Sequence, residues 1–132
     1  MTPRFLLDTH VLVRWLSSPK RLSSDQARII SEAERHRDTL AISAFTLIEI
    51  AMLAQHSRKI QGPADRIFAE LETNPTFTVL PITIPIALDA GALTMLRDSA
   101  DRTIVATARV HGLRLLTSDQ GIIDSNLVSV VD

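Results

Sequence analysis

Glu49 is the only charged side chain in the apolar segment at residues 40–55. From about residue 43 the segment is expected to form a helix with Glu49 near its middle, where a carboxylate has no helix end to cap. Removing an isolated ion from water costs several kcal/mol or more unless a partner compensates it. Glu49 therefore indicates a functional site, and a metal ligand is the interpretation that we favour.

Three aspartates are placed where they can reach the same site as Glu49. Asp8 and Asp119 each follow a short apolar run, where a strand would end, and Asp101 lies at the start of a later helix. Parallel strands gather functional groups in the crevice beyond their carboxyl ends. Four carboxylates together would repel one another and raise their own pKa values unless cations lay between them, as in a Mg²⁺ or Mn²⁺ site.

Each aspartate also has a purely structural interpretation. Aspartate is a leading N-cap residue, worth about 1 kcal/mol, so Asp101 or Asp119 taken singly is equally well explained as a helix cap. We interpret Asp98 as a cap, and Asp8 alone could form a turn. Glu49 has no such capping role.

The apolar pattern alternates between short strands and helices, which indicates an α/β fold with a mainly parallel sheet. Ser23 and Gln26 form a capping-box pattern at the start of one helix, and Gly112 is expected to end another in the left-handed conformation. The predicted strands are residues 4–7, 40–42, 77–82, 113–117 and 127–131. The predicted helices start near residues 11, 23, 43, 63, 83 and 100, and the fifth reaches residue 96.

Length and composition fit one small domain. A chain of 132 residues with 45% hydrophobic content can bury one good core and is too short for two ordinary domains. Its net charge of -1 argues against a constitutively basic nucleic-acid-binding surface, although it does not exclude a nuclease whose acids are offset by bound metal. The absence of cysteine excludes a disulfide framework, a thiolate zinc site and a cysteine nucleophile.

The N-terminal apolar stretch is broken by Asp8 and His10. It is too short for a signal peptide or a membrane span, so we expect a cytoplasmic protein with no membrane partner. The four histidines show no metal-ligand spacing, and only His10 lies near the proposed acidic site.

Three motifs in a fixed order carry a family resemblance: LLDTHVLVRWL at residues 6–16, SAFTLIEIAML at 43–53 and RDSADRTIVATARVHGLRLLTSD at 97–119. Together they resemble PIN-domain proteins, most closely the VapC-type toxins of bacterial type II toxin-antitoxin systems. The resemblance covers nearly the whole chain. Ser99 stands where the family often has proline, and Ile48 stands where an aromatic residue often precedes the glutamate. Neither difference involves one of the acids, so the two differences bear on the subgroup of the family and on its protein partner more than on the chemistry of the acidic site.

The resemblance implies a single PIN-like nuclease domain over residues 1–132, folded as a three-layer α/β/α sandwich. In that family a cluster of acids binds Mg²⁺ or Mn²⁺ and cuts RNA. Motif by motif, Asp8 matches the first acid of the family, Glu49 the second, Asp101 the third and Asp119 the fourth.

Phosphodiester hydrolysis suits such a cluster, because a metal ion activates water and a pair about 4 Å apart stabilises both the attacking and the leaving oxygen. We expect Asp8 and Asp101 to be direct ligands. Glu49 and Asp119 would be ligands or would orient metal-bound water.

Three further residues are expected to assist this site. Thr9 and Thr117 would supply hydroxyls to the same waters. Arg102 would contact substrate phosphate or, as the stronger interpretation, form a structural ion pair.

Two kinds of protein partner are expected besides the RNA substrate. The helix around Glu49 is apolar nearly all round, so it should be buried on more than one side, either in a core or across the interface of a symmetric homodimer. The family resemblance implies a small antitoxin with a DNA-binding part and an inhibitory tail.

Two other interpretations of the acids remain open. Another metal-dependent phosphoryl-transfer domain is one, but a haloacid-type phosphatase needs a second aspartate where His10 stands, and a response receiver needs a lysine where Thr117 stands. The other is a catalytically silent PIN-fold interaction protein. The presence of all four acids argues against it, because an inactive relative could lose them without losing stability.

Overall fold

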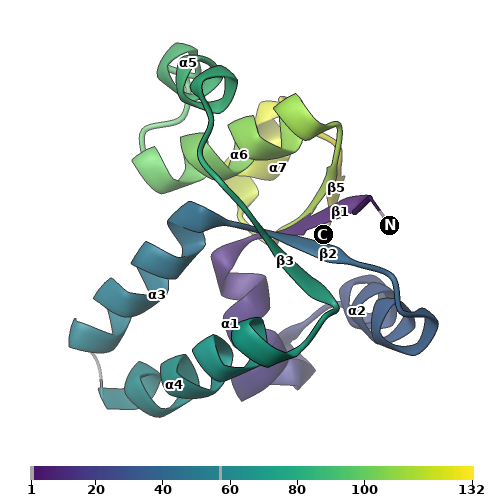
Figure 1. Cartoon of the computed structure of the whole chain (residues 1–132). Helices are drawn as coiled ribbons and strands as arrows, with labels where there is room; N and C mark the ends of the chain where they lie inside the picture. The colour runs from purple at the N-terminus through teal and green to yellow at the C-terminus, as the bar shows by residue number, and fades with distance from the viewer. Residues whose placement is uncertain (1, 57) are drawn as a thin grey trace.

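The computed structural model describes residues 2–56 and 58–132 of the chain, and it contains one sheet whose paired strands all run parallel (Figure 1). The strands are β1 (Phe5–Leu7), β2 (Leu40–Ser43), β3 (Phe77–Leu80), β4 (Arg114–Leu116) and β5 (Val130–Val131). Their order across the sheet is β3-β2-β1-β4-β5. The predicted parallel α/β fold is therefore confirmed.

Helices cover both faces of the sheet, which makes the three layers that the sequence predicts (Figure 1). They are α1 (Thr9–Ser17), α2 (Ser24–His36), α3 (Ala44–His56), α4 (Arg58–Thr73), α5 (Ile84–Ala92), α6 (Ser99–His111) and α7 (Gln120–Ser125), with a short 3₁₀ helix η1 (Pro19–Arg21). In Figure 1, α1, α2 and α4 lie below the sheet and α5, α6 and α7 lie above it. No helix in the described ranges is both long and apolar enough to cross a membrane.

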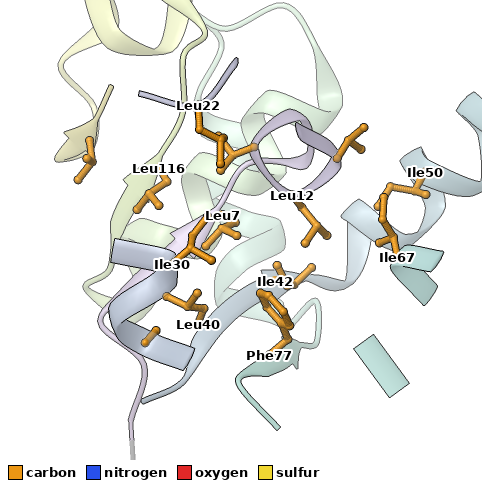
Figure 2. Close-up of a cluster of buried hydrophobic side chains, with 14 of the residues drawn as sticks. Leu7, Leu12, Leu22, Ile30, Leu40, Ile42, Ile50, Ile67, Phe77 and Leu116 are labelled. Carbon is orange, nitrogen blue, oxygen red and sulfur yellow. The ribbon is translucent and has the colours of Figure 1, made fainter. Parts of the chain in front are cut away.

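Successive strand residues pack into two separate hydrophobic cores, one on each face of the sheet, because side chains alternate between the faces of a strand. Leu7, Ile42 and Leu116 pack with α1, α2, α3 and α4 in the core of Figure 2. The preceding residues, Leu6, Ala41 and Leu115, pack on the opposite face with α5, α6 and α7. Burial on both faces explains why the strands are continuously apolar.

Several predicted helix ends are confirmed. The Gln26 amide donates to Ser23 Oγ at 3.1 Å and the Ser23 amide donates to Gln26 Oε1 at 3.3 Å, which completes the capping box. Gln26 is fully buried, and its Nε2 also donates to the Val131 carbonyl at 3.0 Å. Gly112 ends α6 with a φ of 66°, in the left-handed region where a side chain is disfavoured.

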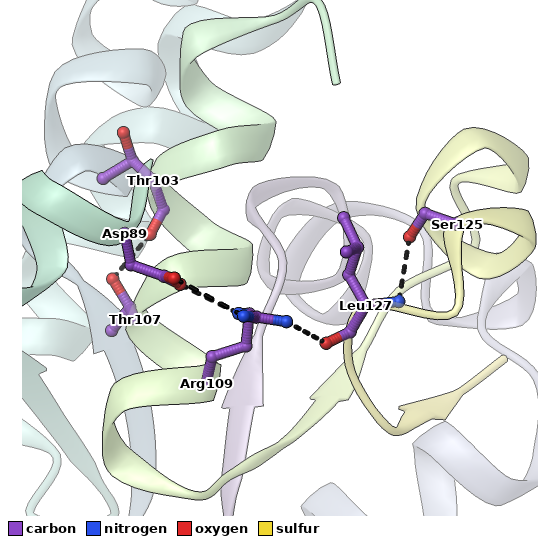
Figure 3. A network of polar contacts seen from close by, with 6 residues as sticks. All are labelled: Asp89, Thr103, Thr107, Arg109, Ser125 and Leu127. Atoms are coloured by element: carbon purple, nitrogen blue, oxygen red, sulfur yellow. Dashed lines mark hydrogen bonds and ion pairs between the residues drawn. The ribbon is translucent and has the colours of Figure 1, made fainter. Parts of the chain in front are cut away.

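An arginine joins three segments on the α6 side of the sheet (Figure 3). Arg109 Nε donates to Asp89 Oδ2 on α5 at 2.9 Å, and its Nη1 donates to the Leu127 carbonyl at 2.9 Å. The contacts hold α5 and the segment before β5 against α6, the helix that carries Asp101.

The structure corrects three predicted element boundaries. Helix α4 begins at Arg58 rather than at Pro63, which lies inside the helix, where its ring nitrogen cannot donate a main-chain hydrogen bond. The helix capped by Thr83 ends at Ala92 rather than at residue 96. The last strand is only Val130–Val131, and α7 is an additional helix after Asp119.

Candidate active site

The predicted acids meet at the point where the strand order reverses. Strands β2 and β3 follow β1 on one side of it and β4 and β5 lie on the other, so the crevice beyond β1 and β4 is a topological switch point. Asp8 directly follows β1, and its amide donates to the Leu116 carbonyl of β4 at 2.9 Å. Asp119 lies three residues beyond the end of β4. Sheet topology therefore brings together two acids that are more than one hundred residues apart.

Asp8 is the most enclosed of the four acids, with 5% of its surface exposed. Burial raises the pKa of its carboxyl, and the Thr117 hydroxyl, which donates to Asp8 Oδ2 at 2.7 Å, opposes that rise. Thr117 is itself fully buried and accepts a hydrogen bond from the Asp119 amide at 3.1 Å. The threonine thus fixes one oxygen of Asp8 and connects it to the segment that carries Asp119.

Glu49 extends from the middle of α3 and is partly buried. Burial raises its pKa, and the hydroxyl of Thr9, which donates to Glu49 Oε1 at 2.5 Å, lowers it. Thr9 Oγ1 also lies 2.9 Å from Thr46 Oγ1. The Thr9 hydroxyl has one hydrogen, and it uses that hydrogen in the bond to the Glu49 carboxylate. In the hydrogen bond between the two threonines, Thr46 must therefore be the donor.

Thr46 was not among the predicted site residues. It lies three positions before Glu49 on the same helix, and residues at that spacing share a helix face. That spacing is the sequence signal that would have identified it.

Asp101 shows the strongest electrostatic perturbation among the acids. It lies in the first turn of α6, and its pKa is raised from 3.8 to about 7. Burial is the largest cause, and the charges of Asp119, Asp98, Asp8 and Glu49 add to it. The four predicted acids therefore lie close enough to act on one another, and Asp98 belongs to their surroundings.

Two of the aspartates cap helices. Asp119 Oδ1 accepts a hydrogen bond from the Ile122 amide at 3.0 Å at the start of α7. Asp98 Oδ1 accepts from the amides of Ala100 and Asp101, at 2.7 and 3.1 Å, at the start of α6. The cap interpretation of Asp98 is confirmed. Asp119 is a cap whose charge also raises the pKa values of Asp8 and Asp101.

Arg102 does not form the predicted ion pair. Its guanidinium donates to the main-chain carbonyls of Leu96 and Thr94 rather than to a carboxylate. The ion-pair interpretation is therefore wrong. Both carbonyls lie after the end of α5, which stops at Ala92, before the predicted end at residue 96, so they have no donor within that helix. Arg102 therefore stabilises the connection from α5 to α6.

The donor chemistry of the cluster fits a divalent cation of the Mg²⁺ or Mn²⁺ type. Such ions prefer oxygen ligands, and a cation would relieve the repulsion that raises the pKa of Asp101. In residues 2–56 and 58–132, no three His, Cys, Asp or Glu side chains are already arranged to hold one ion. At least some of the carboxylates would therefore need to change rotamer to share a metal.

Comparisons with known proteins agree with the fold. A family model described as the PIN domain matches residues 5–125. The chain is 37% identical over 118 residues to the ribonuclease VapC22 of Mycobacterium tuberculosis, a match that spans 87% of this chain and 86% of the relative.

Two solved structures show the same fold. A toxin-antitoxin complex from Klebsiella pneumoniae contains a chain 25% identical to this one, with a TM-score of 0.66 and coverage of 96% of this chain and 95% of the other. VapBC2 from Rickettsia felis, bound to a promoter DNA fragment, matches at 14% identity with a TM-score of 0.74 and 96% coverage of both chains, which is a likeness of fold alone.

The raised pKa of Asp101 predicts a pH-dependent effect of Asp101→Asn on metal-free stability. The folded protein holds this proton more tightly than the unfolded chain does, so stability falls as the pH rises from about 4 to about 7. Asparagine removes that loss. After allowance for solvent screening, we expect the variant to gain about 1 kcal/mol in free energy of unfolding at pH 8, and less at pH 5.

Urea unfolding with EDTA at both pH values measures this effect. The exposed Asp65, on α4, provides the matched control, because Asp65→Asn removes the same charge outside the cluster. An equal gain for Asp101→Asn at pH 5 and pH 8 would contradict the electrostatic coupling.

Proposed function

The chain belongs to the PIN-domain family, and from this premise we propose that it is a metal-dependent endoribonuclease that acts as the toxin of a toxin-antitoxin pair in the cytoplasm. The observation that carries the proposal is the electrostatic coupling of four carboxylates at the switch point of the sheet. The identity to a relative named as a ribonuclease supports RNA as the substrate.

Asp8 and Asp101 would hold Mg²⁺ or Mn²⁺ directly, and Glu49 and Asp119 would complete the ligand set or orient bound water. When bound, the ion supplies activation of water and stabilisation of charge on the phosphoryl and leaving oxygens. Four acids without a cation would otherwise repel an RNA phosphate.

The chain's own hydroxyls orient these ligands. Thr117 holds Oδ2 of Asp8, and the Thr46–Thr9 pair holds Oε1 of Glu49. Asp8 and Glu49 therefore each keep one oxygen hydrogen-bonded to a threonine and have a second oxygen for the cation. Burial of Asp8 and Thr117 limits competing water at this side of the site.

We predict that Asp8→Asn and Asp101→Asn each reduce RNA cleavage to the assay background while folding remains intact, because a ligand is lost and repulsion is relieved. Cleavage of RNA in Mn²⁺ and thermal melting with and without Mn²⁺ measure the two effects, with Asp65→Asn as control. Mn²⁺ should raise the melting temperature of the unmodified protein and of the control more than that of the two variants.

Equal stabilisation of all four proteins by Mn²⁺ would show that Asp8 and Asp101 are not the ligands of the metal. If the unmodified protein binds Mn²⁺ but cuts no RNA, the catalytically silent interpretation would replace the nuclease.

A symmetric homodimer is the second part of the proposal. Within one chain, α3 is buried on one side only: Thr46 and Ile50 are buried, whereas Ile48 is 53% and Met52 is 58% exposed. We define these two exposed residues as the α3 face. Pairing of two such faces would bury the side that the single chain leaves open and would place two acidic sites beside a shared groove.

Light scattering at micromolar concentration should give the mass of two chains. Ile48→Glu should shift it to one chain, because a charge would be buried in the interface. Val110→Glu is the control, since Val110 is an exposed apolar residue on α6 outside the α3 face. A single-chain mass for the unmodified protein would remove the dimer.

A small antitoxin is the third part of the proposal, and the solved toxin-antitoxin complexes of similar fold support it. A cleft that holds divalent cations should also accept an arginine, whose planar fork pairs with carboxylates. We therefore expect the antitoxin tail to lay an amphipathic helix near the site and to insert a basic side chain among the four acids.

Inhibition by the antitoxin should weaken as Mn²⁺ is raised and when that basic residue is replaced by alanine. Steady-state cleavage assays with the purified complex measure both effects. A complex that retains full Mn²⁺ affinity in the cleft and is nevertheless inactive would contradict the arginine insertion.

A further inference from the structure

A second surface feature lies next to the acids, between α1, η1 and α4. It is a groove of about 640 Å³ whose charged or titratable side chains are His10, Arg14 and Arg21, with Ser17 and Ser18 between them. No acidic side chain in the described part of the chain lines it. We call this feature the α1 groove.

The two arginines of the α1 groove are not neutralised by the protein. Within residues 2–56 and 62–132, whose side chains the structure describes, the ion pairs of arginine involve Arg28 and Arg109, and neither Arg14 nor Arg21 has a carboxylate within 4.0 Å. Arg21 is exposed and Arg14 is partly exposed. In a chain whose net charge is -1, two unpaired guanidinium groups at one groove form a local site for an anion.

His10 places the α1 groove beside the acidic site. The charge of His10 acts on both Asp8 and Glu49, so its ring lies near these carboxylates, and the same residue lines the groove. Arg14 follows His10 by one helical turn on the same face of α1, about 6 Å along the axis. A row of donors therefore leads from the acids to Arg14 and then to Arg21 on η1.

We propose that the α1 groove binds the sugar-phosphate backbone of the RNA strand beside the bond that is cut. Arg14 and Arg21 contact successive phosphates, the serine hydroxyls contact the same backbone, and His10 lies where the strand enters the acidic site. The proposal rests on the proposed function. It explains how an acidic cluster that repels a polyanion can still hold one: the attraction is supplied next to the acids rather than among them.

The test compares the salt dependence of RNA binding in variants that keep the apolar stem of arginine. The probe is a labelled 20-nucleotide single-stranded RNA of mixed sequence, and binding is followed by fluorescence anisotropy in EDTA, where a metal-dependent nuclease leaves the RNA intact. The variants are Arg14→Gln, Arg21→Gln and the double variant. Arg35→Gln is the matched control, because Arg35 is exposed and occupies the last turn of α2 as Arg14 occupies the last turn of α1.

Each lost phosphate contact should lower the slope of log K against log salt by about 0.7, and the double variant should lower it by about 1.4. The double replacement by lysine should restore the slope, because lysine keeps the charge. Arg35→Gln should leave the slope unchanged. In Mn²⁺, the double variant should raise KM for RNA cleavage more than it lowers kcat, because the groove binds substrate without touching the reacting atoms.

A double variant with the same slope as Arg35→Gln would overturn the proposal. So would a variant that binds RNA normally but no longer binds a 12-residue oligoglutamate peptide, since the groove would then fit an acidic protein segment. The proposed function is judged separately: the unmodified protein either cuts RNA in Mn²⁺ or does not, whatever the slopes show.

Discussion

Repulsion among like charges is the constraint that the rest of this structure has to accommodate. Sheet order and helix placement bring Asp8, Glu49, Asp101 and Asp119 into one electrostatic environment, and their mutual effect with burial raises the pKa of Asp101 to about 7. A fold selected only for stability would not gather four acids at a partly buried edge. The strain is local and is offset by two well-packed cores on the faces of the sheet.

Buried threonine hydroxyls make this concentration of charge structurally defined. Thr117 and Thr9 each donate a hydrogen bond to one carboxylate, and Thr46 donates to Thr9 in turn. Helix caps fix the neighbouring backbone, with Asp98 starting α6 and Asp119 starting α7. The protein therefore orients Asp8 and Glu49 through neutral donors, whereas two unpaired cations, Arg14 and Arg21, lie outside the cluster in the α1 groove.

The parts of the fold that depend on local pattern were predictable from the sequence. Continuous apolar runs identified the parallel strands, and the Ser23 capping box and Gly112 identified helix ends that the structure confirms. The acids followed from their positions after strands and within an apolar helix. Features that depend on tertiary contacts were not predicted. Thr46 takes part in the site only because α3 packs beside Thr9. Arg102 donates to a carbonyl that is left without a helical partner because α5 ends before residue 96. The interior position of Pro63 shows that a favoured helix start does not exclude a longer helix.

The most direct measurement of the central claim is the number of protons released when Mn²⁺ binds. Calorimetric titrations at pH 6.5, in two buffers with different ionisation enthalpies, give this number. If the four carboxylates form one cation site, binding should displace the proton held by Asp101, so release should approach about one proton per ion and should largely disappear at pH 8. Binding without proton release at pH 6.5, or no Mn²⁺ binding at all, would contradict the account.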